Sequence, residues 1–170
     1  MLLRPAEPED ALAVARVHVR SWQAAYRTLL PDAYLDQLRP EDRAQKYDFA
    51  NLDPFKPRTI VAMDEGAICG FATTAPSRDT DLADHAELCA LYVDPAQWGR
   101  GMGVALVAAA RAHLLGLRFR HAMLWVLAGN VRAERFYQMD KWAPDGLRRR
   151  DTVWGITVDE VRYRRGLEMR

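Results

Sequence analysis

The order of elements between residues 86 and 127 constrains the fold more than any other feature of the sequence. The apolar run Ala86–Val93 has the composition of a strand, and so does Ala122–Leu127. Between them, a glycine-rich turn from Trp98 to Gly103 leads into an apolar segment of helical length that ends at Gly116. Two neighbouring strands joined by such a helical crossover run parallel. The segment therefore predicts a parallel strand pair within an α/β fold, with a heavily buried helix between the strands.

Shorter patterns predict the remaining elements. Two β-rich runs, Thr59–Met63 and Ala67–Thr74, flank the turn Asp64-Glu65-Gly66 and indicate an antiparallel hairpin. Strands are also expected over 2–5 and 153–163, and loops over 75–85 and 143–152. Apolar periodicity, prolines and the N-cap residue Asn130 predict helices over 8–26, 31–38, 40–50, 103–115 and 130–139. Together these patterns predict a mixed, mostly antiparallel sheet with helices on both faces.

Length and composition indicate one globular unit. The chain has 170 residues, of which 49% are hydrophobic and 28% charged, with no internal repeat or low-complexity linker. We therefore expect a single domain over 1–170. No apolar run approaches the roughly 18 residues of a membrane helix, and acidic residues from Glu7 to Asp10 interrupt any signal peptide. These features predict a cytoplasmic protein that does not bind a membrane.

Charge and cysteine content exclude further classes. The 24 basic and 23 acidic residues give a net charge of +1, which offers no general electrostatic basis for binding nucleic acid. Cys69 and Cys89 are too few for a disulfide framework and lie in apolar runs, so both are expected to be buried free thiols. The histidines His18, His113 and His121 show no metal-ligand spacing. The sequence therefore predicts no metal site.

The glycine-rich turn Trp98-Gly99-Arg100-Gly101-Met102-Gly103 is the strongest candidate for a binding site. Glycines allow backbone amides to converge on an anion, and the start of the following helix adds unpaired N–H groups. Arg100 could add a charge contact, so a diphosphate is the natural guest. Tight turns also use glycine without binding anything. A nicotinamide dinucleotide site would need a third glycine where the sequence has Val-Ala-Leu, and a P-loop would need Gly-Lys-Ser/Thr.

Two blocks of residues, in order, are similar to the GCN5-related N-acetyltransferase (GNAT) family. The first resembles the acetyl-CoA signature Gln/Arg-x-x-Gly-x-Gly/Ala and comprises Leu91–Pro95, Trp98–Gly103 and Leu106. Trp98 stands where glutamine or arginine is commonest. The second resembles the family's strand and its Asn-x-x-Ala-x-x-Phe-Tyr helix and comprises Leu124–Leu127, Asn130, Ala133, Phe136 and Tyr137. Lys141-Trp142 follows, where the family usually has Gly-Phe.

The resemblance implies the GNAT fold, with a central splayed parallel pair, and it implies acetyl transfer from acetyl-CoA to a primary amine by direct attack in a ternary complex. The diphosphate would lie on the turn and the pantetheine between the splayed strands. The implied cofactor-binding residues are Leu91, Tyr92, Val93, Trp98, Gly99, Arg100, Gly101, Met102, Gly103, Val104, Asn130, Ala133 and Phe136. Asn130 could also simply cap its helix.

The resemblance also implies catalytic roles. Tyr137 is placed as general acid toward the leaving thiolate, although an aromatic residue beside Phe136 could equally be core. Glu87 lies eleven positions before Trp98, where histone-type members carry a glutamate base. It is the first candidate base, alone or through water, and a solvent-exposed charge at a strand end is the alternative. His85 is the second candidate, because its ordinary pKa suits proton transfer near neutral pH.

The acceptor is expected to be a small amine, an amino acid or a polyamine. Trp22, Tyr26 and Tyr34 could wall its cleft. Five acids could attract a cation: Asp32, Asp36, Asp79, Asp81 and Asp84. A protein N-terminus or lysine as acceptor, a non-catalytic acyl-CoA-binding module and a nicotinamide-binding enzyme stay open as alternatives. Family members are often dimers, so a homodimer stays open too.

Overall fold

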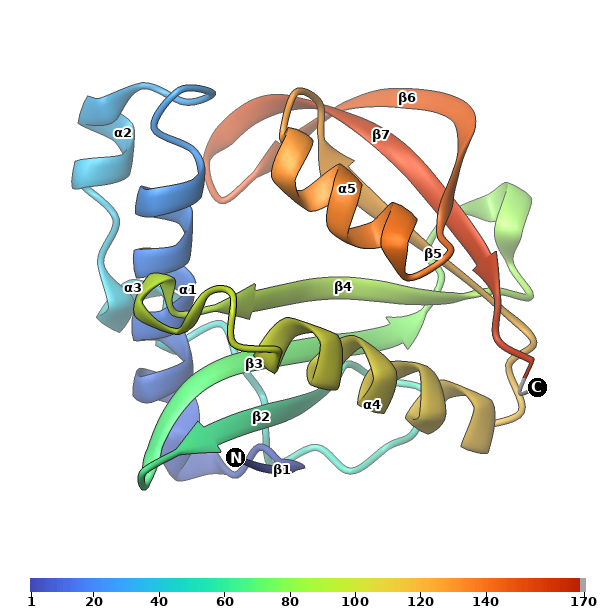
Figure 1. The fold of residues 1–170 in the computed structure, drawn as a ribbon, viewed down its shortest axis with the longest axis horizontal. Coiled ribbons are helices and arrows are strands. Elements are labelled where there is room, and N and C mark those ends of the chain that lie inside the picture. Colours follow the sequence, from blue (N-terminus) through green and yellow to red (C-terminus); the bar gives the residue numbers. More distant parts are fainter. Residues whose placement is uncertain (169–170) are drawn as a thin grey trace.

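In the described part of the chain, seven strands form one sheet in the order β1-β2-β3-β4-β5-β7-β6. The computed structural model describes residues 1–168 (Figure 1). The strands are β1 (Leu2–Pro5), β2 (Arg58–Asp64), β3 (Ala67–Pro76), β4 (Ala86–Val93), β5 (His121–Leu127), β6 (Ala143–Val153) and β7 (Ile156–Gly166). All neighbouring strands pair antiparallel except β4 and β5, which are parallel. The mixed, mostly antiparallel sheet predicted from the sequence is confirmed.

Within residues 1–168, five α-helices and three short 3₁₀ turns connect the strands. The helices are α1 (Ala11–Ala25), α2 (Asp32–Asp36), α3 (Pro40–Ala44), α4 (Met102–Gly116) and α5 (Val131–Met139). The 3₁₀ turns are η1 (Pro8–Asp10), η2 (Thr80–Leu82) and η3 (Pro95–Gln97). The helix predicted over 40–50 is only five residues long. No helix within residues 1–168 combines the length and apolar character needed to cross a membrane.

Helices cover both faces of the sheet because neighbouring residues of each strand point to opposite sides. Phe71 on β3 packs with Val14 and Val17 of α1. The next residue, Ala72, belongs instead to the core cluster that contains Leu106 of α4. Figure 1 shows α4 and α5 in front of the sheet. One strand thus anchors α1 and α4 on opposite faces.

Helix α4 is buried along one stripe only, which corrects the expectation of a heavily buried helix. Its buried residues are Met102, Leu106, Val107, Ala110 and Leu114. Val104, near its start, is 63% exposed although the segment is apolar nearly all round. The reason is that the start of α4 borders an open cavity rather than another element.

The parallel pair separates soon after it begins. Strands β4 and β5 pair only at Ala86 with Ala122 and at Glu87 with Met123, although the strands run for eight and seven residues. β4 also contains a bulge, because Thr73 pairs with residue 90 and Thr74 with residue 88, which leaves Cys89 as the extra residue. The predicted splay is confirmed, and it opens the sheet at its centre.

The C-terminal hairpin differs from the prediction. Residues 143–152, expected to be a loop, belong to β6, and β7 begins at Ile156 rather than at residue 153. The two strands are joined by the two-residue turn Trp154-Gly155, in which both residues have positive φ, as tight hairpins require. β6 is an edge strand with a mostly exposed, charged sequence. It therefore lacks the alternating apolar pattern by which a half-buried strand is recognised.

Candidate active site

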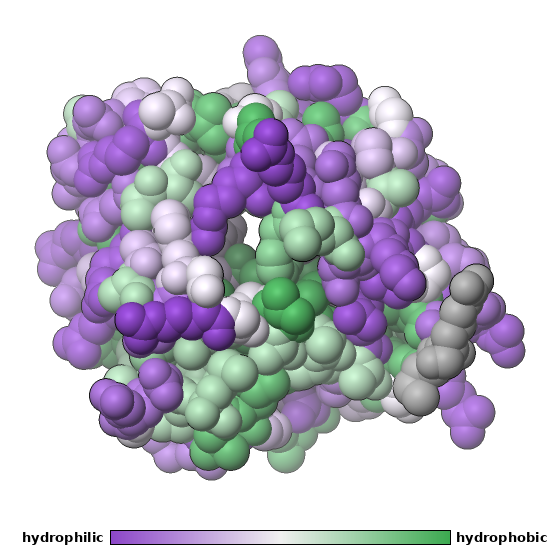
Figure 2. All heavy atoms as spheres, in the orientation of Figure 1, coloured by the Kyte–Doolittle hydropathy of each residue, from purple (hydrophilic) through white to green (hydrophobic). Residues whose placement is uncertain are grey.

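A large cavity opens where β4 and β5 separate. It has a volume of about 1550 Å³ and is lined by parts of α1, α3, β4, β5, α5, the start of α4 and the β6–β7 turn. Figure 2 shows the surface hollowed near its centre, with hydrophobic side chains below the opening and hydrophilic ones above it. The cavity therefore passes from the glycine-rich turn to the aromatic side chains of α1.

The glycine-rich turn presents unpaired backbone amides to this cavity. Gly101 forms the N-cap of α4 with a φ of +85°, a left-handed conformation that glycine adopts without strain. A Cβ on Gly103 would lie 3.2 Å from the ring of Phe136. Within residues 1–168, the first backbone bond of α4 runs from the Ala105 N–H to the Gly101 carbonyl. The amides of 99–104 therefore have no backbone partner and can bind an anion.

The contacts of Trp98 fix the backbone between β4 and the glycine-rich turn. Its indole Nε1 donates to the Val93 carbonyl at 2.8 Å, and the guanidinium of Arg132 lies 3.6 Å from its ring centroid. Before it, Asp94 accepts from the Ala96 N–H and forms an ion pair with Arg20. The departure from the family's usual glutamine or arginine thus replaces a polar side chain with an indole tied to the end of β4.

Most of the predicted cofactor-binding residues line the cavity. They are Leu91, Tyr92, Val93, Trp98, Gly99, Gly101, Met102, Gly103, Val104, Asn130, Ala133 and Phe136. Arg100 is exposed and is not among the lining residues within 1–168. Asn130 caps α5, because its Oδ1 accepts from the Ala133 N–H at 3.2 Å. The structure thus brings together residues from two segments about 30 positions apart.

Tyr137 borders the cavity from α5. It is 9% exposed and packs edge-on against Phe136 and Trp142, with ring centroids 5.3 and 6.1 Å away. Burial, followed by the neighbouring Tyr92 and Asp140, raises the pKa of the Tyr137 phenol well above its usual value. The phenol therefore remains protonated and can donate a proton or a hydrogen bond into the cavity.

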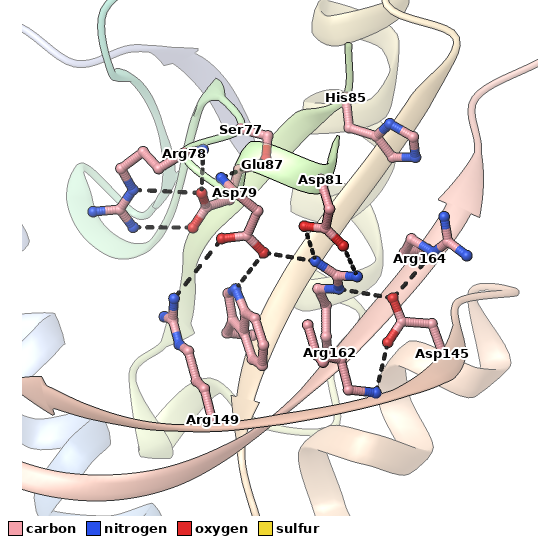
Figure 3. Close-up of polar contacts among 12 residues, drawn as sticks. Ser77, Arg78, Asp79, Asp81, His85, Glu87, Asp145, Arg149, Arg162 and Arg164 are labelled. Atoms are coloured by element: carbon pink, nitrogen blue, oxygen red, sulfur yellow. Dashed lines mark hydrogen bonds and ion pairs between the residues drawn. The ribbon is translucent and has the colours of Figure 1, made fainter. Parts of the chain in front are cut away.

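Glu87 lies at the last paired position before the strands separate and lines the cavity. Its side chain is 4% exposed, and Oε2 accepts from Nη2 of Arg78 at 3.0 Å (Figure 3). His85 does not line the cavity formed by residues 1–168. Its Nδ1 lies 2.7 Å from Asp84 Oδ1, and its ring stacks on His121. Only the first of the two candidate bases therefore faces the cavity.

The structure adds Glu160, which the sequence analysis missed. Glu160 lies on β7, lines the cavity and is 9% exposed. Burial raises the pKa of its carboxyl, and the bond from Arg149 Nε at 2.8 Å opposes this shift. Val158, Glu160 and Arg162 alternate on the inward side of β7. Charged residues on the buried face of a strand were the signal that could have identified it.

An arginine-centred network fixes the β3–β4 loop beside the cavity (Figure 3). The side chain of Arg162 is 6% exposed and bonds Asp79 at 3.0 Å, Asp81 at 2.7 Å and Asp145 at 2.7 Å. Hydrogen bonds to these acids hold the pKa of Arg162 above its usual range. Asp79 also accepts from the Trp125 indole at 3.1 Å. The network ties a loop between β3 and β4 to strands β5, β6 and β7.

The acids expected to attract a cationic acceptor are already paired. Asp79 and Asp81 bond Arg162, and Asp84 bonds His85. The other two, 32 and 36, both pair with Arg27 on the surface. None of the five is among the cavity-lining residues within 1–168. They therefore give the cavity no free negative charge.

Five rings, here called the aromatic chamber, wall the cavity beyond β4: His18, Trp22, Tyr26, Tyr92 and Trp154. His18 stacks on Tyr92 with centroids 4.7 Å apart and lies 4.9 Å from the Trp154 ring. Of the predicted wall residues, Trp22 and Tyr26 belong to the chamber. Tyr34 lies outside the cavity formed by residues 1–168, and its hydroxyl donates to the Trp154 carbonyl at 2.6 Å. The Tyr34 hydroxyl thus holds the β6–β7 turn in place from outside the cavity.

The two cysteines differ. Cys69 is buried, as expected, but Cys89 is exposed and lines the cavity. The bulge at Cys89 places this residue outside the regular pairing with β3, which an apolar run in the sequence could not reveal. No group of three or more His, Cys, Asp or Glu side chains in the described part of the chain could hold a metal ion.

Comparisons with known proteins identify related chains. The model of the acetyltransferase (GNAT) family matches residues 19–140. The uncharacterized N-acetyltransferase YuaI of Bacillus subtilis (strain 168) is 33% identical over 162 residues, which cover 94% of this chain and 89% of that protein.

Solved structures share the fold at lower identity. A GCN5-related N-acetyltransferase from Rhodopseudomonas palustris has a TM-score of 0.76 at 20% identity, covering 97% of this chain and 94% of that chain. YncA from Salmonella typhimurium, solved with its cofactor acetyl-CoA, has a TM-score of 0.72 at 15% identity, covering 100% of this chain and 95% of that chain.

Proposed function

The chain belongs to the acetyltransferase (GNAT) family and is an N-acetyltransferase, and we propose that it transfers the acetyl group of acetyl-CoA to a primary amine by direct attack in a ternary complex. The observation that carries the proposal is the row of unpaired amides over 99–104, which opens onto the cleft between β4 and β5. The presence of acetyl-CoA in the structure of YncA supports this choice of co-substrate.

The cleft offers a backbone edge to the pantetheine arm. Beyond Glu87, β4 has no pairing with β5 in residues 1–168. The Val93 carbonyl accepts from Ser21 Oγ at 3.0 Å and from Trp98 Nε1 at 2.8 Å, while the next N–H, of Asp94, donates to the Cys69 carbonyl of β3 at 2.7 Å. Alternate residues of a strand direct their backbone groups to the same side. The backbone of Leu91 therefore faces the opening, where its N–H can polarise the thioester carbonyl.

The proposed reaction forms one C–N bond and breaks one C–S bond. The neutral amine attacks the thioester carbonyl, the thiolate of coenzyme A leaves, and the amine loses its extra proton. Burial keeps the Tyr137 phenol protonated, so that it donates a proton or a strong hydrogen bond to the leaving sulfur. Glu87 accepts the amine proton, directly or through water, and Glu160 replaces His85 as the second candidate for this role.

Two measurements test the proposed function. Calorimetric titration with coenzyme A should give saturable binding, and acetyl-CoA should release free thiol in the presence of amines. Binding without thiol release on any amine or peptide would instead indicate an acyl-CoA-binding module. A flat titration, combined with thermal stabilisation by NAD, would contradict the acetyl-CoA assignment. Release only with peptides would identify a protein N-terminus or lysine as the acceptor.

A further inference from the structure

We propose that Arg132 of α5, held by the ring of Trp98, binds the diphosphate of acetyl-CoA together with the amides of the glycine-rich turn. This inference rests on the proposed function, since it names a side chain that holds the co-substrate. Arg132 lies about 30 positions after the turn, outside both blocks of residues from which the binding site was predicted. It adds a charged side chain to a site otherwise built from backbone amides.

Trp98 has no polar group of its own to offer a ligand. The one polar atom of its side chain, the indole Nε1, donates to the Val93 carbonyl at 2.8 Å. This bond fixes the indole at the end of β4, immediately before the unpaired amides of 99–104. The guanidinium carbon of Arg132 lies 3.6 Å from the centroid of this ring, close enough for a cation–π interaction. The indole therefore holds a cation from another segment beside the turn.

The stacking leaves the hydrogen-bond donors of Arg132 free. At 3.6 Å the two planes must lie face to face, because an edge-on guanidinium would keep its carbon farther from the ring. The five N–H donors of a guanidinium lie in its plane, so they point past the indole. Within residues 1–168, Arg132 has no ion-pair or hydrogen-bond partner, and it lines the cavity with a solvent-accessible side chain. Its donors are therefore available to a phosphate, whose oxygens they can bind in pairs.

The face of α5 that carries Arg132 approaches the glycine-rich turn at a second point. Phe136 lies four residues after Arg132, and side chains with this spacing lie on one face of a helix. A Cβ on Gly103 would lie 3.2 Å from the Phe136 ring. Phe136 thus packs at the last glycine of the turn, while Arg132 covers its first residue, Trp98. An anion on the amides between these two contacts lies beside the guanidinium.

The electrostatic surroundings favour an anion next to Arg132. Two other arginines of the cavity are already paired, Arg78 with Glu87 and Arg149 with Glu160. Partial burial lowers the pKa of the Arg132 guanidinium, and no acid within residues 1–168 raises it again. The guanidinium stays charged, because the ordinary pKa of arginine is far above neutral. Since two charges interact more strongly where water is partly excluded, a phosphate is a suitable counter-ion for this group.

The first experiment measures three ligands on the wild type and on Arg132→Gln by titration calorimetry. Coenzyme A carries a diphosphate and a 3′-phosphate, and dephospho-coenzyme A carries the diphosphate alone. Pantetheine, measured by displacement, carries neither. Arg132→Gln should raise the Kd for both coenzymes by about 10- to 100-fold, the range for a hydrogen bond to a charged group. The Kd for pantetheine should not change.

Three results of this experiment would overturn the proposal. A loss confined to coenzyme A would assign Arg132 to the 3′-phosphate, an equal loss with pantetheine would mean that the variant distorts the cleft, and unchanged binding of coenzyme A would leave Arg132 without a role. A wild type that binds none of the three ligands would instead contradict the proposed function itself.

The matched control is Arg135→Gln. Arg135 lies nearly one turn further along α5 and also lines the cavity with an accessible side chain, but no ring within residues 1–168 holds its guanidinium. The variant removes the same charge, so its Kd for coenzyme A should stay close to that of the wild type. A loss as large as that of Arg132→Gln would mean that positive charge near the cleft suffices, which would overturn the specific role of Arg132.

The second experiment tests whether Trp98 acts through Arg132. Trp98→Leu should raise the Kd for coenzyme A by about 2- to 30-fold, the range of a cation–π interaction. The same change should have little effect in the Arg132→Gln background, because the ring then has no cation to hold. Arg132→Lys should recover part of the affinity, since it keeps the charge but not the planar fork. An equal effect of Trp98→Leu in both backgrounds would overturn the proposal, whatever the stability of the variants.

Discussion

The two halves of the cavity are built in different ways. The half that we assign to the cofactor consists largely of backbone groups from one continuous stretch, the end of β4 and the turn into α4. The half that we assign to the acceptor consists of side chains from α1, α3, β4 and the β6–β7 turn, which lie far apart in the sequence. A backbone site can keep its geometry while side chains change, whereas a side-chain site is altered by single substitutions. We therefore expect the first half to be common to the family and the second to determine the acceptor.

Tyr137 lies between the two halves, and its removal should have the largest effect on activity. Tyr137→Phe keeps the buried ring but removes the proton that we assign to the leaving thiolate. We expect kcat to fall by about 10²- to 10⁴-fold, with the KM for acetyl-CoA nearly unchanged. Steady-state kinetics with saturating acetyl-CoA measures both. Tyr163→Phe is the matched control, because the Tyr163 hydroxyl donates to Glu134 away from the cavity lining. An unchanged kcat in Tyr137→Phe would remove the phenol from the mechanism.

The network around Arg162 joins the β3–β4 loop to strands β6 and β7. Removing its central cation shows how much this connection contributes to the stability of the fold. Arg162→Leu leaves Asp79, Asp81 and Asp145 close together without their shared cation. Because Asp79 and Asp145 are largely buried, the free energy of unfolding should fall by about 3–5 kcal/mol, measured by urea denaturation.

Arg150→Leu provides the comparison for Arg162→Leu. Its ion pair with Asp159 is exposed on both sides, so its removal should cost less than about 1 kcal/mol. Equal effects of the two substitutions would mean that the buried network contributes little to stability.

Binding of coenzyme A to the backbone half should weaken when the backbone geometry is disturbed at one glycine. Gly101→Val forces a branched residue into a φ of +85° and places a side chain beside the amides that we assign to the diphosphate. The Kd for coenzyme A should rise by roughly 10- to 100-fold, equivalent to one or two strained or lost interactions of about 1–3 kcal/mol. Titration calorimetry measures this change.

Gly66→Val is the control for Gly101→Val. Gly66 has a similar φ of +79° with open space around it, but it lies in the β2–β3 turn. Its substitution should lower stability without changing the affinity for coenzyme A. If both variants bind coenzyme A normally, the diphosphate is held elsewhere.

The difference between the backbone half and the side-chain half of the cavity also explains what the sequence could predict. The parallel pair and the glycine-rich turn follow from local patterns, since strand composition, glycines and a helix start occur together within residues 86–116. The positions of Arg43 and Trp154 at the cavity could not be predicted, because their contacts arise only when α3 and the β6–β7 turn fold against α1. β6 was missed because its charged, mostly exposed sequence shows no apolar alternation. The bulge at Cys89 depends on pairing with β3, and no local pattern encodes it.

The smallest expected effect is that of Glu160→Gln, and it distinguishes Glu160 from Glu87, two of the carboxylates that line the cavity. A general base must be ionised, so kcat/KM falls as the pH drops through its pKa. Glu87→Gln should flatten this acidic limb, whereas Glu160→Gln should leave it in place and change the rate by a few-fold at most. Because burial raises the pKa of Glu160, a limb that belonged to Glu160 would lie at a higher pH than that of an ordinary glutamate. A pH profile of kcat/KM with the best acceptor measures this for both variants. If Glu160→Gln alone flattens the limb, the proton is accepted on β7, and the pair formed by Glu87 and Arg78 serves to hold the β3–β4 loop.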